Sequence, residues 1–117
     1  MRLRTVIWVK AYIRRCEVAG FPAAIVRHGD DDAGAIFIRI NRLDGTSDLF
    51  TPAPAGRDEA DRDRQWVHAS AAAPEPDERI EHRLSREASF DPDLWIVEVE
   101  APKGDHMLEG WIANFRG

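Results

Sequence analysis

The 117-residue sequence predicts a single α+β domain, residues 1–117, in which an antiparallel β-meander of four to five strands packs against two helices. Two observations predict this class. Apolar residues recur at helical spacing in two separate segments, and short segments of alternating apolar and polar residues lie between and after them. Because short turns join the strands, we expect hairpins, and we expect both helices to cover mainly one face of the sheet.

The N-terminal helix is expected over residues 5–19, where Gly20 lies just beyond its last turn. On a helical wheel, Trp8, Tyr12 and Cys16 share one side, which predicts a side that packs against the sheet. The β-branched start of this segment is also typical of a strand. The basic and small residues that follow favour the helix.

Strands are predicted where β-branched and aromatic residues alternate with polar ones, in residues 23–28, 35–42, 48–51, 65–69 and 94–100. The clearest pattern places Ile36, Ile38 and Ile40 on one face of the second of these strands. An acidic loop separates the first two strands, so we expect them to pair as a hairpin. Asp44-Gly45 indicates a tight turn before the third strand.

The second helix is predicted over residues 77–88, before the last strand. Ile80, Leu84 and Ala88 recur there at four-residue spacing and form a narrow apolar stripe. Residues 52–76 contain prolines, alanines and mixed charges with little apolar pattern. They are expected to form an irregular connection and are the best candidate for a mobile segment.

Composition excludes several classes of protein. The single cysteine, Cys16, cannot form an intramolecular disulfide, and its place on the apolar side of the helix predicts a buried, inert thiol. No apolar stretch is long enough to span a membrane, so we expect a cytoplasmic protein. The net charge of −5 disfavours general affinity for nucleic acids. Residues 1–42 nevertheless hold eight basic and four acidic residues, a basic first third that could contact anions weakly.

No pattern assigns a metal, a cofactor or a catalytic residue. Asp30, Asp31 and Asp32 could offer oxygens to a cation, but adjacent aspartates in a loop are typical turn formers. The four histidines are widely separated, and the glycine patterns that bind phosphates or dinucleotides are absent. Glu98 and Glu100 share a strand face, where paired carboxylates could serve acid–base chemistry but usually form a wet surface.

A basic group is the main candidate for ligand binding. If the first two strands pair, Arg27 and Arg39 approach each other, with Phe37 between them as a stacking ring. The alternative is that these arginines pair with acids such as Asp48 on neighbouring strands. The full set of anion-binding candidates is Arg14, Arg15, Arg27, Arg39, Asn41 and Arg42.

Phe37 and Phe50 are the interface candidates, because we place both on the sheet face opposite the three isoleucines. If helices cover only one face, a second subunit or another protein covers these rings. The leading expectation is therefore a non-enzymatic binding or adaptor module that docks an unknown protein partner or an identical subunit as a homodimer. The alternatives are a small enzyme or binder of an anionic metabolite, and a weak nucleic-acid contact through the basic first third.

Four sequence blocks together resemble an alphaproteobacterial family known only as a domain of unknown function, DUF1491. They are WVKAYIRRC at 8–16, VRHGD at 26–30 followed by DAGAIF at 32–37, NRLDG at 41–45, and FDPDLWIVEVE at 90–100. The resemblance covers most of the chain and is weakest over residues 55–80. It implies a bacterial cytoplasmic protein of one domain. The family carries no assigned activity, so it implies no site residues.

Overall fold

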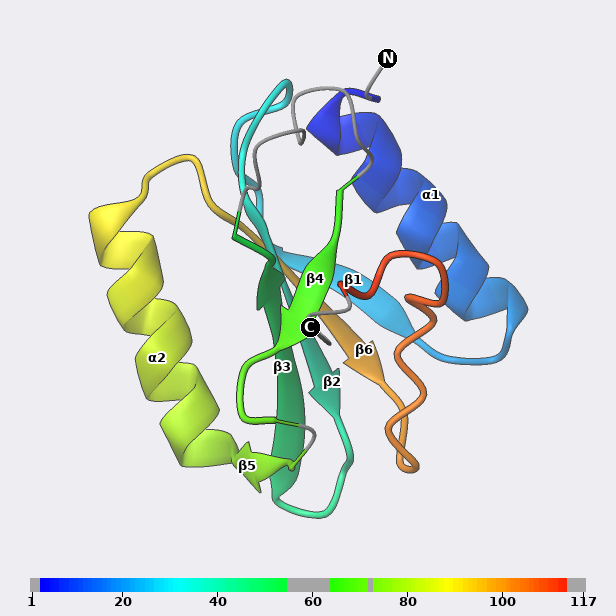
Figure 1. Cartoon of the computed structure of the whole chain (residues 1–117). Helices are drawn as coiled ribbons and strands as arrows, with labels where there is room; N and C mark the ends of the chain where they lie inside the picture. Colours follow the sequence, from blue (N-terminus) through cyan, green and yellow to red (C-terminus); the bar gives the residue numbers. More distant parts are fainter. Residues whose placement is uncertain (1–2, 55–63, 72, 114–117) are drawn as a thin grey trace.

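The computed structural model of the chain describes residues 3–54, 64–71 and 73–113. These residues form two helices and one sheet (Figure 1), so the α+β class is confirmed. In chain order the elements are α1 (Thr5–Val18), β1 (Ala23–Arg27), β2 (Ile36–Asn41), β3 (Thr46–Pro52), β4 (Trp66–His68), β5 (Glu75–Pro76), α2 (Asp77–Phe90) and β6 (Trp95–Glu100). Residues 55–63 and 72 of the expected irregular connection lie outside the described residues. The short strands β4 and β5 lie within the described parts of that connection.

The sheet is mixed, because β6 lies between β1 and β2. The strand order is β1-β6-β2-β3-β4, and β5 also pairs with β3. β6 is antiparallel to β1 and parallel to β2. The predicted pairing of β1 with β2 is therefore wrong, whereas the β2–β3 hairpin forms as expected. The physical reason is burial: successive β6 residues Trp95, Ile96 and Val97 are all buried, and a strand buried on both faces belongs in the middle of a sheet.

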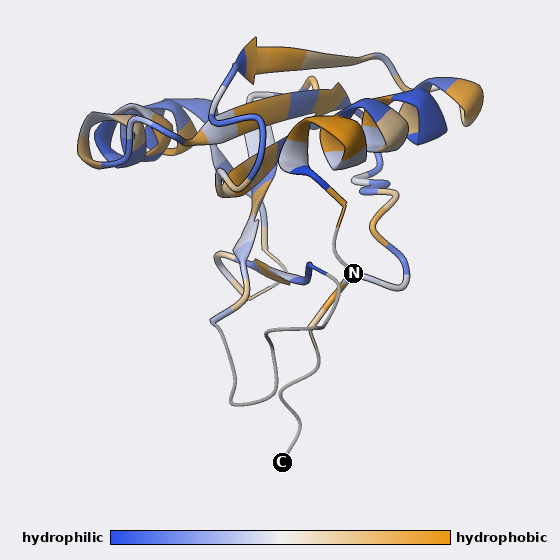
Figure 2. Cartoon of the chain, turned by 90° about the horizontal axis from the view of Figure 1, so that it is seen from above, coloured by the Kyte–Doolittle hydropathy of each residue, from blue (hydrophilic) through white to orange (hydrophobic). Residues whose placement is uncertain are grey.

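Each helix covers a different face of the sheet, which differs from the expectation that both cover mainly one. Figure 1 shows α1 and α2 on opposite sides of the strands, and the view from above in Figure 2 shows hydrophobic and hydrophilic residues on both helices. The sheet face opposite the three isoleucines is also apolar, because it carries Phe37, Leu49 and Ile96. The second face therefore needs a cover of its own, and α2 supplies it.

We name the faces after their helices. The α1 face is lined by a large core that contains Trp8, Val9, Tyr12, Cys16, Ile36, Ile38, Ile40, Phe50, Trp66, Trp95, Val97 and Val99. The α2 face is lined by a smaller one that contains Phe37, Leu49, Ile80, Leu84, Leu94 and Ile96. The apolar stripe predicted for the second helix is thus buried at Ile80 and Leu84.

The C-terminal segment, residues 101–113, packs on the α1 face. The Tyr12 hydroxyl donates a hydrogen bond to the carbonyl oxygen of His106 at 2.6 Å. Trp111 lies edge-on to Trp8 with ring centroids 5.2 Å apart, and Ile112 forms a parallel bridge with Trp66. These contacts attach the segment to α1 and to β4. In the described part of the chain, neither helix is long and apolar enough to cross a membrane.

Candidate functional site

The six residues predicted to bind an anion do not converge on one site. Arg14 and Arg15 are exposed on α1, and the Arg15 guanidinium lies 4.9 Å from the ring centroid of Trp111. This cation–π contact helps to hold the C-terminal segment on α1. These two arginines therefore lie on the outside of the helix that covers the α1 face.

Arg27 lies at the end of β1, with β6 between it and Arg39. Its Nη1 donates to the carbonyl oxygens of Pro92 and Leu94, at 3.2 and 2.9 Å. Arg27 is therefore bound to neutral acceptors at the end of the α2–β6 connection. Phe37 does not bridge the two arginines as a stacking ring, because it packs in the core under α2.

Arg39 occupies the centre of an ionic group that we call the Arg39 network. It is only 7% exposed, and its Nε donates to Ser47 Oγ at 3.0 Å. Its guanidinium is 3.1 Å from Asp77, 3.4 Å from Glu81 and 3.7 Å from Glu98. Asn41 donates to Glu98 at 3.2 Å. Three carboxylates around one guanidinium give this group an excess of negative charge, which disfavours a further anion. The network fastens the first turns of α2 to the sheet.

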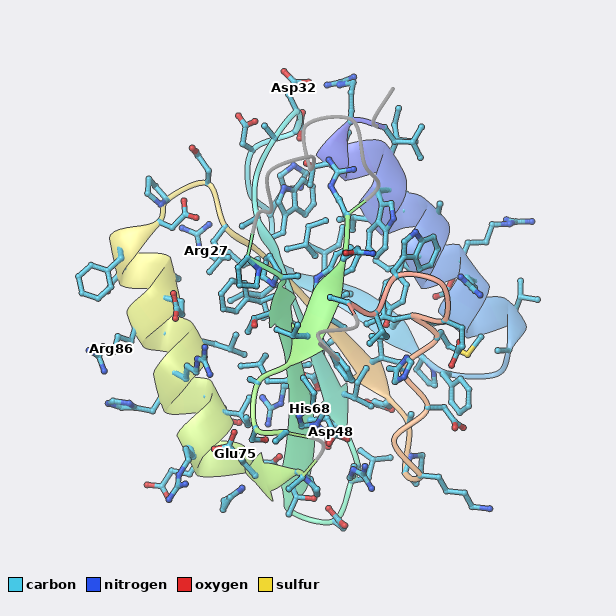
Figure 3. The ribbon with its side chains drawn as sticks, viewed as in Figure 1. Arg27, Asp32, Asp48, His68, Glu75 and Arg86 are labelled. Carbon is cyan, nitrogen blue, oxygen red and sulfur yellow. The ribbon has the colours of Figure 1, made fainter. Side chains whose placement is uncertain are left out.

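Arg42 belongs to a second group of charged side chains. We call it the Asp48 cluster and define it as Arg42, Asp48 and His68. Asp48 is 3% exposed, and it accepts hydrogen bonds from Arg42 Nε at 2.7 Å and from His68 Nε2 at 2.8 Å. Figure 3 shows Asp48 and His68 next to each other. The backbone N–H of Ser70 donates to His68 Nδ1 at 3.2 Å. The sequence alternative paired Arg27 and Arg39 with acids such as Asp48. Arg39 does pair with acids, but Asp48 pairs with Arg42 and Arg27 contacts backbone carbonyls.

A histidine beside a buried aspartate is an arrangement found in general bases. The hydrogen bonds of His68 show whether one of its ring nitrogens is available for that role. Nδ1 accepts from Ser70, which places the proton on Nε2, where it is donated to Asp48. Both ring nitrogens are therefore occupied within the chain, and neither is free to take a proton from a substrate. This pattern fits a contact that holds β4 and the following turn to β3.

Phe37 and Phe50 lie on opposite faces, whereas sequence analysis placed both opposite the isoleucines. The pairing of Ile38 with Phe50 puts Phe50 on the isoleucine face. Phe50 is 5% exposed, with its ring centroid 5.0 Å from each of His68 and His106. Phe37 is 8% exposed in the core under α2. Segments of the same chain therefore cover both rings.

The acidic loop satisfies its own backbone. Asp30 Oδ2 accepts from the N–H groups of Asp32 and Ala33, and Asp32 also forms an ion pair with Arg4 at 2.6 Å. This is the turn-forming use of aspartate. Among the residues that the structure describes, no group of three or more acidic, histidine or cysteine side chains could hold a metal ion. Cys16 is fully buried, and burial raises the pKa of its thiol.

The surface that sequence analysis missed is the outward side of α2. We call it the α2 basic face and define it as Arg79, His82, Arg83, Arg86 and Phe90. At 3.6 residues per turn, these five positions fall within roughly one third of the helix circumference, on a side centred roughly 130° from Ile80 and Leu84. Their spacing of three, four and seven residues was readable from the sequence once the buried side was known.

The α2 basic face lines an open hollow. The hollow has a volume of about 440 Å³ and is lined by the five residues of the face together with Glu87. Phe90 is 77% exposed at its end, and Figure 3 shows Arg86 pointing away from the sheet. The acidic residues Asp77 and Glu81 point the other way, into the Arg39 network. Helix α2 therefore has an acidic inner edge, and its outer side carries the α2 basic face together with the exposed Glu78 and the partly exposed Glu87.

The positive charge of this face is weakly compensated. Arg79 is 3.7 Å from Glu75 and Arg83 is 3.8 Å from Glu87, long contacts between partly exposed groups. An exposed pair four residues apart in a helix, such as Arg83 with Glu87, contributes only about 0.3–0.5 kcal/mol, and other exposed ion pairs contribute about 0.2–1 kcal/mol. No carboxylate among the described residues forms an ion pair with Arg86. A carboxylate from outside can therefore replace or join these contacts at little cost.

The comparisons with known proteins agree with the fold and leave the function open. The model of the family described as protein of unknown function (DUF1491) matches residues 3–109, and the chain belongs to this family. No curated protein matches the chain.

Three solved structures are similar to the chain over most of its length. A crystal structure of a DUF1491 family protein from Caulobacter crescentus CB15 is 35% identical, with a TM-score of 0.77, and the match covers 97% of this chain and 100% of that one. An NMR structure of a DUF1491 family protein from the same organism is 36% identical, with a TM-score of 0.78, covering 97% and 99%. A solution structure of a protein from A. tumefaciens is 40% identical, with a TM-score of 0.72, covering 86% and 87%.

Proposed function

We propose that this protein is a non-enzymatic binding module that docks an acidic segment of a partner protein on the α2 basic face. The observation that carries the proposal is the clustering of three arginines and a histidine around a hollow of about 440 Å³, beside the exposed ring of Phe90. Guanidinium groups bind carboxylates through paired hydrogen bonds, and an exposed aromatic ring offers contact for an apolar side chain.

Charge complementarity favours an acidic peptide over a nucleic acid. The chain as a whole carries −5, so a long polyanion is repelled by most of the surface. A short acidic segment needs only the local charge of one helix side, which is basic. The hollow is also open, which suits an extended peptide better than a small metabolite enclosed in a pocket.

The alternative of an anion-binding enzyme is less well supported by the described residues. Arg39 and Arg42 are already paired with carboxylates, and the imidazole of His68 uses both its nitrogens within the chain. A reaction would need a group that is free to meet a substrate. The proposal extends to a single cytoplasmic domain, which the buried, free Cys16 supports because an unpaired thiol suits a reducing compartment.

A binding measurement with charge-reversed variants tests the proposal. A fluorescent peptide rich in Asp and Glu with one central Leu is titrated with the wild type and with the double variant Arg83→Glu, Arg86→Glu. We expect the variant to bind at least about tenfold more weakly, and we expect wild-type binding to weaken as NaCl is added. The matched control is Lys10→Glu, Arg14→Glu, which reverses two exposed charges on α1.

Two results contradict the proposal. One is equal loss of peptide binding in both double variants, which would show dependence on net charge alone. The other is binding of single-stranded RNA that is tighter than binding of the peptide at the same salt and is lost in the α2 variant. That outcome assigns the face to nucleic acid.

A further inference from the structure

Four members of the α2 basic face form a closed set of neighbours. We call them the basic quartet and define it as Arg79, His82, Arg83 and Arg86. In a helix, residues three or four positions apart are neighbours, with Cβ atoms about 5–6 Å apart. By this spacing, Arg79 and Arg86 each neighbour both His82 and Arg83. The four side chains therefore surround one point on the helix surface, and all four line the hollow of about 440 Å³.

The carboxylates on this part of α2 stand at the margins of the quartet. At about 100° per residue, Glu78 and Glu87 fall roughly 90° to either side of the centre of the α2 basic face. Glu87 approaches Arg83 only to 3.8 Å, and the Arg83 side chain remains 42% exposed. Arg79 remains 73% exposed beside Glu75, at 3.7 Å. The quartet therefore keeps most of its hydrogen-bond donors for a ligand.

The positions of the quartet fit one compact, highly charged group better than a row of carboxylates. His82 and Arg83 lie on opposite sides of the line from Arg79 to Arg86, about 4.5 and 6.0 Å along the helix axis from Arg79. Side chains on one side of a peptide recur about every 6.6 Å in a strand and about every 9.3 Å in polyproline II, so a row of carboxylates meets only part of the set. A phosphomonoester places about −1.5 to −2 charges and three acceptor oxygens at one point. Guanidinium groups bind such a group through paired hydrogen bonds.

Phe90 adds an apolar contact at a fixed distance from the quartet. It lies about 11 Å along the helix axis from the centre of the quartet, and its ring is 77% exposed. In polyproline II, residues three apart point the same way and lie about 9.3 Å from each other. A leucine three residues from a phosphorylated residue can therefore contact the ring while the phosphate lies over the quartet. A small phosphorylated metabolite cannot make both contacts, so the two together favour a peptide.

We infer that the α2 basic face binds a phosphorylated serine or threonine of a partner protein, with the phosphate over the basic quartet. The inference rests on the proposed function, because it names the group that the acidic docking segment carries. Acidic residues around the phosphorylated residue add attraction to the same face. Phosphorylation of the partner then decides when the two proteins bind.

Titration with four matched fluorescent peptides tests the inference. Each peptide is acidic and has a leucine three residues to either side of its central position. That position holds phosphoserine, serine or glutamate, and the fourth peptide has two adjacent central glutamates that match the charge of phosphoserine. Near neutral pH, we expect the phosphopeptide to bind at least about tenfold more tightly than each of the others. Equal binding of the two-glutamate peptide overturns the inference, because charge alone would then be sufficient.

The double variant Arg83→Lys, Arg86→Lys separates hydrogen-bond geometry from charge. Lysine keeps the positive charge but lacks the planar guanidinium that binds a phosphate with two parallel hydrogen bonds. We expect the preference for phosphoserine over two glutamates to fall at least about threefold, while the two-glutamate peptide binds nearly as it does to the wild type. Arg14→Lys, on the exposed side of α1, is the matched control and should keep the full preference. An undiminished preference in the double variant contradicts the inference.

Competition with free O-phosphoserine distinguishes a partner segment from a small metabolite. We expect unlabelled phosphopeptide to displace the probe at a concentration at least about tenfold lower than O-phosphoserine does, because the free amino acid cannot reach Phe90. Phe90→Ala should weaken the phosphopeptide and leave O-phosphoserine unchanged. Equal potency of the two competitors assigns the hollow to a metabolite and overturns the inference. The proposed function fails by a different result, in which Arg83→Glu, Arg86→Glu binds the two-glutamate peptide as the wild type does.

Discussion

The α1 face and the α2 face of the sheet are held by different kinds of contact. On the α1 face, Trp8 stacks against Tyr12 and Trp66 with ring centroids 5.1 and 4.5 Å apart, and Trp66 and Trp95 are fully buried. On the α2 face, a narrow apolar stripe is supplemented by the Arg39 network. Burial of large apolar side chains thus provides most of the contacts that hold the α1 face, whereas ion pairs contribute more to the attachment of α2.

This difference predicts that the two faces respond to different conditions. Apolar burial is insensitive to moderate salt, whereas ion pairs between partly exposed groups are screened by it. The α1 face instead contains buried groups that ionise at high pH. Burial raises the pKa of Tyr12 and of Cys16, because the charged phenolate and thiolate lose their hydration inside the core. Salt should therefore loosen α2, and alkaline pH should loosen α1.

The largest expected effect is that of Trp66→Ala on the α1 face. The side chain is 1% exposed, and its Nε1–H donates to the carbonyl oxygen of Ile36 at 2.8 Å. Loss of this ring should lower the free energy of unfolding by about 3–5 kcal/mol, measured by urea denaturation. The matched change on the other face is Leu84→Ala, for which we expect the smaller loss of about 2–3 kcal/mol. A greater loss for Leu84→Ala would reverse the ranking of the two faces.

An intermediate effect is expected for Arg39→Met, which keeps an apolar stem and removes the charge. The free energy of unfolding should fall by about 2–3 kcal/mol at low salt. The loss is moderate because the exposed Glu81 is solvated by water once its arginine partner is removed. The difference between wild type and variant should shrink in high NaCl, as followed by urea denaturation in both buffers. Arg14→Met, on the exposed side of α1, serves as the control and should change stability by less than about 0.5 kcal/mol. A difference that does not depend on salt would refute the ionic account of α2 attachment.

The smallest effect is that of Tyr12→Phe, which removes the hydrogen bond to His106. Near neutral pH the cost should be about 1 kcal/mol. Above about pH 10 an unfolded tyrosine releases its proton while the buried one retains it, so the unfolded state binds fewer protons and wild-type stability falls as pH rises. The phenylalanine variant has no phenolic proton to release, so its stability does not fall for this reason. The stability difference between the two proteins should therefore narrow by about 1 kcal/mol between about pH 9 and pH 11.

Urea denaturation at a series of pH values measures this narrowing. Burial raises the pKa of the Cys16 thiol, but a hydrogen bond from Tyr12 lowers it, so the two proteins are compared in a Cys16→Ala background. A difference that stays constant across the series would mean that Tyr12 ionises normally in the folded chain.

The sequence predicted where helices and strands occur better than it predicted which strands pair, because helices and strands depend on local spacing. The alternation of Ile36, Ile38 and Ile40 and the stripe of Ile80 and Leu84 were both confirmed. The position of β6 depends instead on a pairing across more than fifty residues, for which local pattern carries no information. The apolar residues on both faces of β6 were the available signal for a central strand.

The candidate site was harder to predict, since a charged residue looks the same in sequence whether it is paired or free. Arg39 was expected to bind an anion, yet its partners Asp77 and Glu81 come from a helix nearly forty residues later. The α2 basic face was more accessible to prediction. Its members follow from the side of the helix that is not buried, and the predicted stripe already defined that side.

The insertion of β6 between β1 and β2 also has a consequence for how the chain reaches this structure. Strand β1 and one edge of β2 both belong to the first part of the chain. Among the described residues, β6 is the strand that pairs with each of them. The central ladder must therefore wait until residues 95–100 have been synthesised and have closed long loops around α2. Such nonlocal pairing slows folding. Until it is complete, β2 can pair only with β3, so the edge that later receives β6 stays open to pairing with another chain.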